Sequence, residues 1–250
     1  MHEKRWRCYA LTVNGLPQEI RYNEATVEGL FLPLLHRLTA LQVEKGGRIL
    51  AFLAAPPATG KSTLLQFMEQ LAREHGDLPQ VQTLGMDGFH YPNAYLTSHT
   101  ILRDGAEIPL KNIKGAPETF DVALLAEKLK AAKAGVTTFP VYDRRIHDPR
   151  PDALKVDASI LLIEGNWLLL DEEPWRDLRA LADYSVRIDA APELLRERLI
   201  GRKMQGGLSE AEARAFYEAS DAVNVLRFAA HAGVADEVWR MEADGDFVRG

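Results

Sequence analysis

The sequence predicts an α/β fold with a mostly parallel sheet, because short apolar runs alternate along the chain with helical patterns. The apolar runs, each long enough for one strand, lie at 48–55, 81–86, 158–163 and 184–188. The helical patterns lie at 61–75, 121–134, 174–182 and 192–204. Since the apolar runs have no polar face, we expect strands that helices cover on both sides.

The composition is that of a globular protein with one main core. The chain has 250 residues, of which 46% are hydrophobic and 26% are charged. No linker separates a second domain, so we expect a hairpin and helix over 1–47 appended to a single domain over 48–250.

Charge and cysteine content exclude several classes of protein. The formal net charge of −6 provides no overall basic field, so we expect no nucleic-acid partner and no binding to an anionic membrane. Cys8 is the only cysteine, the start of the chain lacks the apolar core of a secretion signal, and no apolar stretch reaches the roughly 18 residues of a spanning helix. We therefore expect a cytoplasmic protein, and a homodimer is compatible with the sequence.

The two ends of the chain carry hairpin patterns. Alternating segments flank Asn14-Gly15, a dipeptide that favours a two-residue turn, and the last residues alternate around Asp244-Gly245. A helical pattern follows the first hairpin, with Asn23 as its cap, Pro33 as a bend or a fresh start, and Gly46-Gly47 as its end. Residues 88–120 lack periodicity and are too long for a simple connection, so we expect them to fold over a site.

The stretch "AAPPATGKST" at 54–63 resembles a phosphate-binding loop. Such a loop has the pattern GxxxxGKS/T between a strand and a helix, and its backbone N–H groups converge on a phosphate at the helix N-terminus. Gly60, Lys61 and Ser62 fit the pattern, whereas Ala55 replaces the first glycine, which is tolerable if φ there is negative. We expect the nucleotide to be bound by Ala58, Thr59, Gly60, Lys61, Ser62 and Thr63. The alternative is a surface turn that happens to contain a lysine.

Two carboxylates end predicted strands, where ligands gather in parallel sheets. Asp87 is a candidate general base, and its alternative role is to form an Asx-type turn before Gly88. Glu164 follows four apolar residues and is a candidate for orienting a water on Mg²⁺, because carboxylates rarely enter cores unpaired. Its alternative is a turn residue before Gly165.

Two further segments are rich in charge. Arg198 and Arg202 are four residues apart on one helical face, which suits a lid that closes on phosphates, although a solvated helix with Glu193 and Glu197 as partners has the same pattern. The segment "FPVYDRRIHDPRPD" concentrates aromatic, acidic and basic residues to a degree unusual for a connector. His147 within it is by itself more typical of a surface histidine than of a ligand-binding one.

The order of "AAPPATGKSTLL", "MDGFHYPNAYL", "KGAPETFD", "FPVYDRRIHDP" and "LLIEGNWLLLDEEPW", followed by "LRERLIGRKMQGGLSEAEA", resembles the P-loop kinase superfamily that contains bacterial pantothenate kinase, uridine kinase and phosphoribulokinase. The resemblance covers about residues 48 to 230. It is closest to a bacterial nucleoside/nucleotide kinase branch, also described as fructose-transport-system kinase-like, in which the N-terminal hairpin is shared. It implies a P-loop NTPase three-layer sandwich with a helical lid, and ATP and Mg²⁺ as cofactors.

The resemblance also implies roles for single residues. Asp87 falls on the catalytic aspartate of the family, Lys61 and Ser62 on its phosphate and Mg²⁺ residues, and Glu164 on its acidic residue near the metal. The remaining assignments are two lid arginines and four substrate-binding residues: Arg198, Arg202, His90, Tyr142, Arg145 and His147. Tyr142 and His147 match the pair that holds the nucleoside in uridine kinase, whereas "KGAPETFD" looks like pantothenate kinase, so the two comparisons favour different substrates.

These observations favour a kinase that transfers the γ-phosphoryl group of ATP to a hydroxyl of a small metabolite such as a nucleoside, a pantothenate-like compound or a sugar. A regulatory ATPase or switch shares the loop and the acidic strand end, but it needs no second polar pocket facing the γ-phosphate. Only Ala55 and Ala58, which replace loop glycines, favour a binding module without catalysis. The acceptor and the choice between ATP and GTP stay open.

Overall fold

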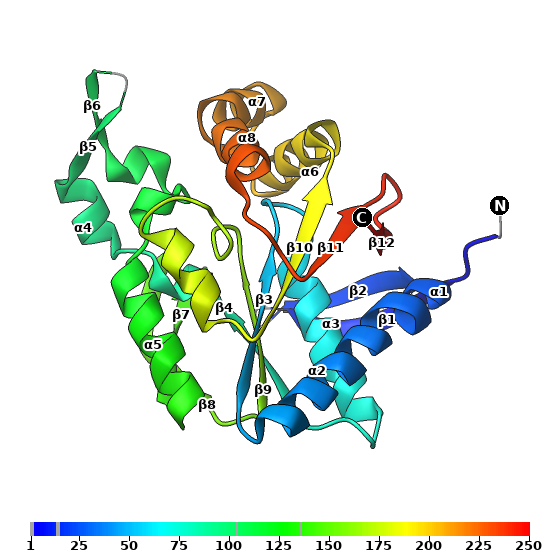
Figure 1. The fold of residues 1–250 in the computed structure, drawn as a ribbon. Coiled ribbons are helices and arrows are strands. Elements are labelled where there is room, and N and C mark those ends of the chain that lie inside the picture. Colours follow the sequence, from blue (N-terminus) through cyan, green and yellow to red (C-terminus); the bar gives the residue numbers. More distant parts are fainter. Residues whose placement is uncertain (1–2, 14–15, 104, 136) are drawn as a thin grey trace.

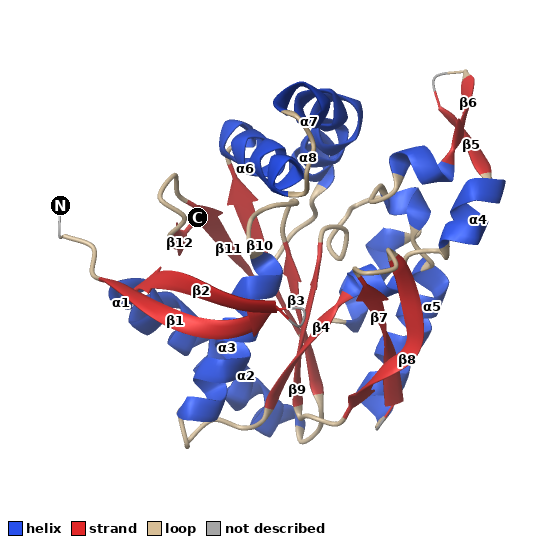
Figure 2. Ribbon diagram, turned by 180° about the vertical axis from the view of Figure 1, so that it is seen from behind, coloured by secondary structure: helices blue, strands red, loops and turns tan. Residues whose placement is uncertain are grey.

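The computed structural model describes residues 3–13, 16–103, 105–135 and 137–250. A six-stranded sheet in the order β12-β11-β10-β3-β9-β4 forms its centre (Figures 1 and 2). Its strands are β3 (Ile49–Ala54), β4 (Val81–Gly85), β9 (Ile160–Gly165), β10 (Tyr184–Ala190), β11 (Glu237–Met241) and β12 (Phe247–Arg249). All neighbours pair in parallel except β11 and β12, so the predicted α/β fold with a mostly parallel sheet is confirmed.

Helices cover both faces of this sheet. One face carries α2 (Leu32–Lys45) and α3 (Lys61–Glu74), and the other carries α5 (Val122–Ala134) with a 3₁₀ turn at Trp175–Leu181. Successive residues of β3 alternate between the two cores, which explains why that strand is apolar throughout. The helical pattern predicted at 174–182 corresponds to this 3₁₀ turn and not to an α-helix.

Three helices pack together beyond the carboxyl ends of the strands (Figure 1). They are α6 (Pro192–Gln205), α7 (Glu210–Phe216) and α8 (Ala222–His231), with a π-helical turn between the last two. A small apolar core of their own, which includes Leu199, Tyr217 and Val225, holds them together. The sequence analysis predicted α6 and missed α7 and α8.

The N-terminal hairpin packs on α3. Strands β1 (Trp6–Val13) and β2 (Leu16–Asn23) pair antiparallel, as predicted, while the predicted turn at Asn14-Gly15 lies outside the described residues. The ring centroid of Tyr22 lies 4.6 Å from that of Phe67 on α3. Hairpin, α2 and α3 thus share one apolar core, and the division into 1–47 and 48–250 stays a prediction.

The first helix is interrupted before Pro33. The side chain of Asn23 caps α1 (Glu24–Thr26) by accepting from the Ala25 amide at 3.4 Å, and a π-helical turn separates α1 from α2. Proline has no N–H to continue the regular α-helical bonding, and a wide turn directly before it accommodates that loss. Gly46 ends α2 at φ 64°, a conformation that glycine adopts without strain.

The remaining elements lie near α5, one group beyond one of its ends and the other beside it (Figure 2). Residues 88–120 contain α4 (Asn93–Ser98) and a small hairpin of β5 (Thr100–Arg103) and β6 (Ala106–Pro109). A second hairpin joins β7 (Thr137–Asp143) to β8 (Asp148–Val156). Within the described ranges, no helix combines the length and the apolar character that crossing a bilayer requires.

Candidate active site

The phosphate-binding loop connects β3 to α3. Ala58 and Gly60 have positive φ angles of 66° and 84°, whereas Ala55 is not among the residues with positive φ. An alanine is therefore tolerated at position 55, where φ is not positive, and the strained backbone lies at Ala58 instead. No side chain caps the start of α3, so its first backbone N–H groups are free to bind an anion. The loop opens into a cavity of about 720 Å³, which Lys61, Ser62 and Thr63 also line.

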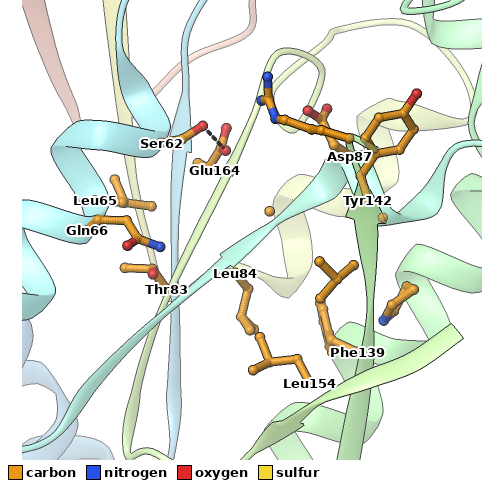
Figure 3. Close-up of a pocket in the computed structure, with 15 residues that line it drawn as sticks. Ser62, Leu65, Gln66, Thr83, Leu84, Asp87, Phe139, Tyr142, Leu154 and Glu164 are labelled. Carbon is orange, nitrogen blue, oxygen red and sulfur yellow. Dashed lines mark hydrogen bonds between the residues drawn. The ribbon is translucent and has the colours of Figure 1, made fainter. Parts of the chain in front are cut away.

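Glu164 lies directly opposite the start of α3. It is next to last in β9, in register with Leu53 of β3 and Gly85 of β4, and this register places its carboxylate beside the loop. Ser62 Oγ donates to Glu164 Oε1 at 2.5 Å, and Lys61 Nζ lies 3.9 Å from Oε2 (Figure 3). Burial raises the pKa of Glu164, and Lys61 opposes that shift.

Asp87 faces the same cavity from the end of β4. It lies in a 3₁₀ turn, Met86–Phe89, and its carboxylate has no hydrogen-bond or ion-pair partner in the described part of the chain. A turn-forming aspartate would accept a nearby backbone N–H, and this one does not. Gly88 serves packing instead, since a Cβ at that position would lie 2.2 Å from the Pro140 carbonyl oxygen.

Asp87 and Tyr142 come together on the far wall (Figure 3). The His90 ring lies 5.3 Å from the Tyr142 ring and 3.8 Å from Phe120. His90 Nδ1 lies 2.8 Å from the Asp87 carbonyl oxygen, which can only accept, so Nδ1 donates and Nε2 is left as an acceptor. Burial lowers the pKa of His90 and raises the pKa of Tyr142, and both shifts favour the neutral form of the side chain.

The hairpin β7–β8 brings one arginine to the cavity, and it is not the predicted one. Arg144 lines the large cavity, whereas Arg145 and His147 are exposed and do not. Arg145 pairs with Asp143 at 3.4 Å, and the backbone carbonyl of His147 accepts from Asn93 at 2.8 Å. The structure therefore brings His90 and Tyr142 together with Asp87 and leaves Arg145 and His147 outside the cavity.

Helix α6 closes the cavity from above the loop. Arg198 and Arg202 line it, together with Lys203, which the sequence analysis did not assign. A guanidinium nitrogen of Arg198 lies 3.8 Å from where a Cβ on Gly60 would sit. Arg198 has no carboxylate within ion-pair distance among the described residues.

The helices that the sequence analysis missed add polar groups. Asp221 and Asn224 line the cavity from the start of α8, and Asn166 lines it after β9. Buried oxygens of Asp221 and Asn166 lack a hydrogen-bond partner in the described structure. Buried polar groups are normally paired, so these two oxygens are available to a ligand.

A second, smaller cavity of about 150 Å³ opens beside Ser62, Asp87 and Glu164 (Figure 3). Leu84, Phe139 and Leu154 line its lower part, and Ser62, Glu164 and Asp87 lie at the other end. Among the residues that the structure describes, Ser62, Asp87 and Arg144 are the ones that line both cavities. The two spaces therefore meet where Asp87 faces the start of α3.

Known proteins resemble the chain over most of its length, although no protein-family model matches it. An Escherichia coli (strain K12) protein named "Uncharacterized protein YggC" is 47% identical over 238 residues, which is 95% of this chain and 97% of that protein. "Putative uridine kinase C227.14" of Schizosaccharomyces pombe is 32% identical over 71% of this chain and 77% of its own length. Pantothenate kinase of Vibrio cholerae is 30% identical over 77% of this chain and 66% of its own.

Solved structures agree with the sequence relatives. A protein described as a "putative fructose transport system kinase" from Silicibacter sp. TM1040 superposes with a TM-score of 0.71 at 31% identity, over 81% of this chain and 98% of that one. YFH7 of Saccharomyces cerevisiae shares the fold, with a TM-score of 0.66 at 19% identity over 84% and 98% of the two chains. The phosphate-binding loop agrees with these relatives, and the chain belongs to the P-loop kinases.

Proposed function

We propose that this protein is an ATP- and Mg²⁺-dependent kinase that transfers the γ-phosphoryl group to a hydroxyl of a small metabolite. One observation carries the proposal: Asp87, a carboxylate without a partner in the described structure, faces Lys61 and Ser62 across a single cavity. A phosphate site alone suits any nucleotide-binding protein. A free carboxylate opposite it is what activation of a hydroxyl requires.

The residues around Ser62 fit a magnesium ion. Mg²⁺ prefers oxygen ligands and is usually held by one or two carboxylates, phosphates and water. Ser62 offers a hydroxyl, and Glu164 offers a buried carboxylate 2.5 Å from it whose charged form is destabilised by burial. When bound, Mg²⁺ neutralises charge on the β- and γ-phosphate oxygens. Ser62 would hold the ion and Glu164 would orient water on it.

Positioning and charge neutralisation would supply most of the rate acceleration, because phosphoryl transfer has a loose transition state. The N–H groups at the start of α3 bind the phosphates, with Lys61 beside them. Arg198 and Arg202 add positive charge from α6 on the opposite side. Asp87 accepts the proton of the acceptor hydroxyl or orients it for in-line attack.

The acceptor would lie against the wall that carries Asp87 and Tyr142 (Figure 3). Tyr142 can donate to it, and Nε2 of His90 can accept from it. Arg145 and His147 could bind it only if the β7–β8 hairpin moved, because neither lines the cavity as the hairpin now stands.

An acceptor screen tests the proposal. ADP release from Mg²⁺-ATP is measured with a panel of hydroxyl compounds that includes uridine, pantothenate and sugars, and products are identified by mass spectrometry. We expect stimulated ADP release with a product heavier by one phosphoryl group, and loss of both in Asp87→Asn. ADP release that responds only to a protein partner, with no phosphorylated small molecule, would support a switch and contradict the kinase.

A further inference from the structure

We propose that the acceptor is anionic, and that its carboxylate or phosphate group binds between Arg144 and Lys114. The inference rests on the proposed kinase function and names the substrate class of the same site. It is carried by two cations that reach the acceptor side of the cavity from different elements.

Arg144 is the first of these cations. Like Asp87 and Ser62, it lines both cavities, so it lies where the acceptor must meet the phosphoryl group. Its neighbours Arg145 and Arg150 pair with Asp143 at 3.4 and 3.7 Å. Among the described residues, Arg144 itself has no carboxylate within ion-pair distance. An arginine held beside a binding cavity without a counter-ion is suited to a bidentate anion.

Lys114 is the second cation. Its Nζ donates to the side-chain oxygen of Asn93 and to the carbonyl of His147, both at 2.8 Å, and neither acceptor is charged. Nζ also lies 5.0 Å from the Tyr142 ring centroid. Burial lowers the pKa of Lys114, and Lys111 adds to that shift, while Asp148 and Asp87 oppose it. An anion beside Nζ would stabilise its charged form.

The nucleotide does not account for these two residues. Its phosphates already have Lys61, the N–H groups of α3, and Arg198 and Arg202 of α6. Arg144 follows Tyr142 by two residues in the β7–β8 hairpin, and Lys114 comes from the segment 88–120, with its Nζ 5.0 Å from the Tyr142 ring centroid. Arg144 also lines the small cavity, which joins Ser62 and Glu164 at one side to Asp87 and Tyr142 at the other, so it lies at the boundary between the nucleotide and the acceptor.

The charge of the large cavity agrees with two anionic ligands. Although the whole chain has a net charge of −6, the basic side chains that line this cavity outnumber the acidic ones. The basic residues are Lys61, Lys114, Arg144, Arg198, Arg202 and Lys203, and the acidic ones are Asp87 and Asp221. A nucleotide whose charge is partly cancelled by Mg²⁺ leaves a positive excess on the acceptor wall.

Matched acceptor pairs test the inference. Each neutral sugar, polyol or nucleoside is compared with its carboxylate and with its phosphate, which separates the two sources of negative charge. We expect the wild-type enzyme to prefer an anionic member of a pair. Arg144→Gln and Lys114→Gln should each raise KM for that acceptor roughly 10- to 100-fold, as expected for a lost charge-assisted hydrogen bond, and leave KM for ATP unchanged. Arg150→Gln, on the same hairpin and lining neither cavity, is the matched control.

A second measurement does not depend on the acceptor. Inorganic phosphate is titrated in the presence of saturating Mg²⁺ and a non-hydrolysable ATP analogue, with chloride at equal ionic strength as reference. Phosphate should raise Tm of the wild type and Arg150→Gln, and should not raise Tm of Arg144→Gln. Equal stabilisation of all three would overturn the inference.

The outcomes separate this inference from the proposed function. Preferential phosphorylation of neutral compounds would overturn the anionic acceptor and leave the kinase intact. If Arg144→Gln raised KM for ATP without changing acceptor selectivity, Arg144 would act on the nucleotide and the inference would be wrong. No phosphorylated product from any panel member would count against the kinase itself.

Discussion

Glu164→Gln should change nucleotide affinity in opposite directions with and without Mg²⁺. The Glu164 carboxylate lies 3.9 Å from Lys61 Nζ and accepts from Ser62 at 2.5 Å. Without Mg²⁺ this carboxylate repels the phosphates and competes with them for Lys61. With Mg²⁺ the same carboxylate would help to hold the hydrated ion. The substitution removes the charge and keeps the shape.

The structure indicates that both effects are measurable. The side chains of Lys61 and Glu164 are 14% and 12% exposed, so solvent screens their interaction weakly. Two unit charges about 4 Å apart interact by roughly 4 kcal/mol at an effective dielectric constant of about 20, and desolvation offsets much of this. We expect Mg²⁺-free ADP to bind about 5- to 30-fold more tightly to Glu164→Gln. Loss of a residue that orients a metal shell typically costs 10- to 100-fold in metal affinity, so Mg²⁺-ADP should bind more weakly by about that factor.

Calorimetric titration of ADP in Mg²⁺ and in EDTA measures both effects. The titrations are run at about pH 8, because burial raises the pKa of Glu164 and a higher pH favours its charged form. Glu127→Gln, an exposed position on α5, controls for the change in net charge. Affinity changes of the same sign under both conditions would refute the assignment of Glu164 to the metal.

Further predictions concern the loop and the packing of the two chain ends. Ala58→Gly should raise Tm by about 2–4 °C, because it relieves about 1 kcal/mol of backbone strain at φ 66°. Ala55→Gly should lower Tm, because Ala55 has no positive φ and glycine adds freedom to the unfolded chain. Scanning calorimetry measures the Tm of both variants. Equal effects would show that Ala58 is unstrained. Asp246 is buried, and its carboxylate contacts Thr26 Oγ1 at 2.6 Å and Lys4 Nζ at 2.9 Å. Asp246→Asn should therefore lower the free energy of unfolding, measured in urea at neutral pH, by about 2–3 kcal/mol. Burial alone would raise the pKa of Asp246, but its hydrogen bonds and the ion pair with Lys4 lower the pKa overall. The charged carboxylate therefore stabilises the folded protein fully above about pH 4, and this contribution is lost as the pH falls further and Asp246 is protonated. A difference from wild type that stays constant below pH 4 would contradict this.

The sheet and the phosphate loop could be predicted because their signals are local. Strands β3 and β9 are buried on both faces, and the loop lies directly between β3 and an amphipathic helix. The sequence could predict that Asp87 and Glu164 lie at one site, because each follows or ends a strand and parallel strands end at the same edge of a sheet.

Other parts of the site depend on tertiary contacts that no local pattern encodes. Whether Arg144 or Arg145 faces the cavity depends on the turn between β7 and β8, where His147 has φ 53° and the pairing is irregular after Phe139. Asp221 and Asn224 reach the site only because α8 packs on α6 through apolar residues of both helices. Their acid and amide groups are ordinary surface residues by sequence, and an unpaired buried oxygen becomes visible only in the folded chain.

The most direct test of the account is the turnover of Asp87→Asn with an acceptor from the screen. The substitution preserves size and removes the base, so Kd for Mg²⁺-ADP should stay within about twofold of wild type while kcat falls by roughly 10² to 10⁴. Asp121→Asn, which caps α5 and does not line either cavity, controls for a general effect of aspartate loss. If Asp87→Asn turned over the acceptor at the wild-type rate, Asp87 would have no part in the chemistry and the account would fail.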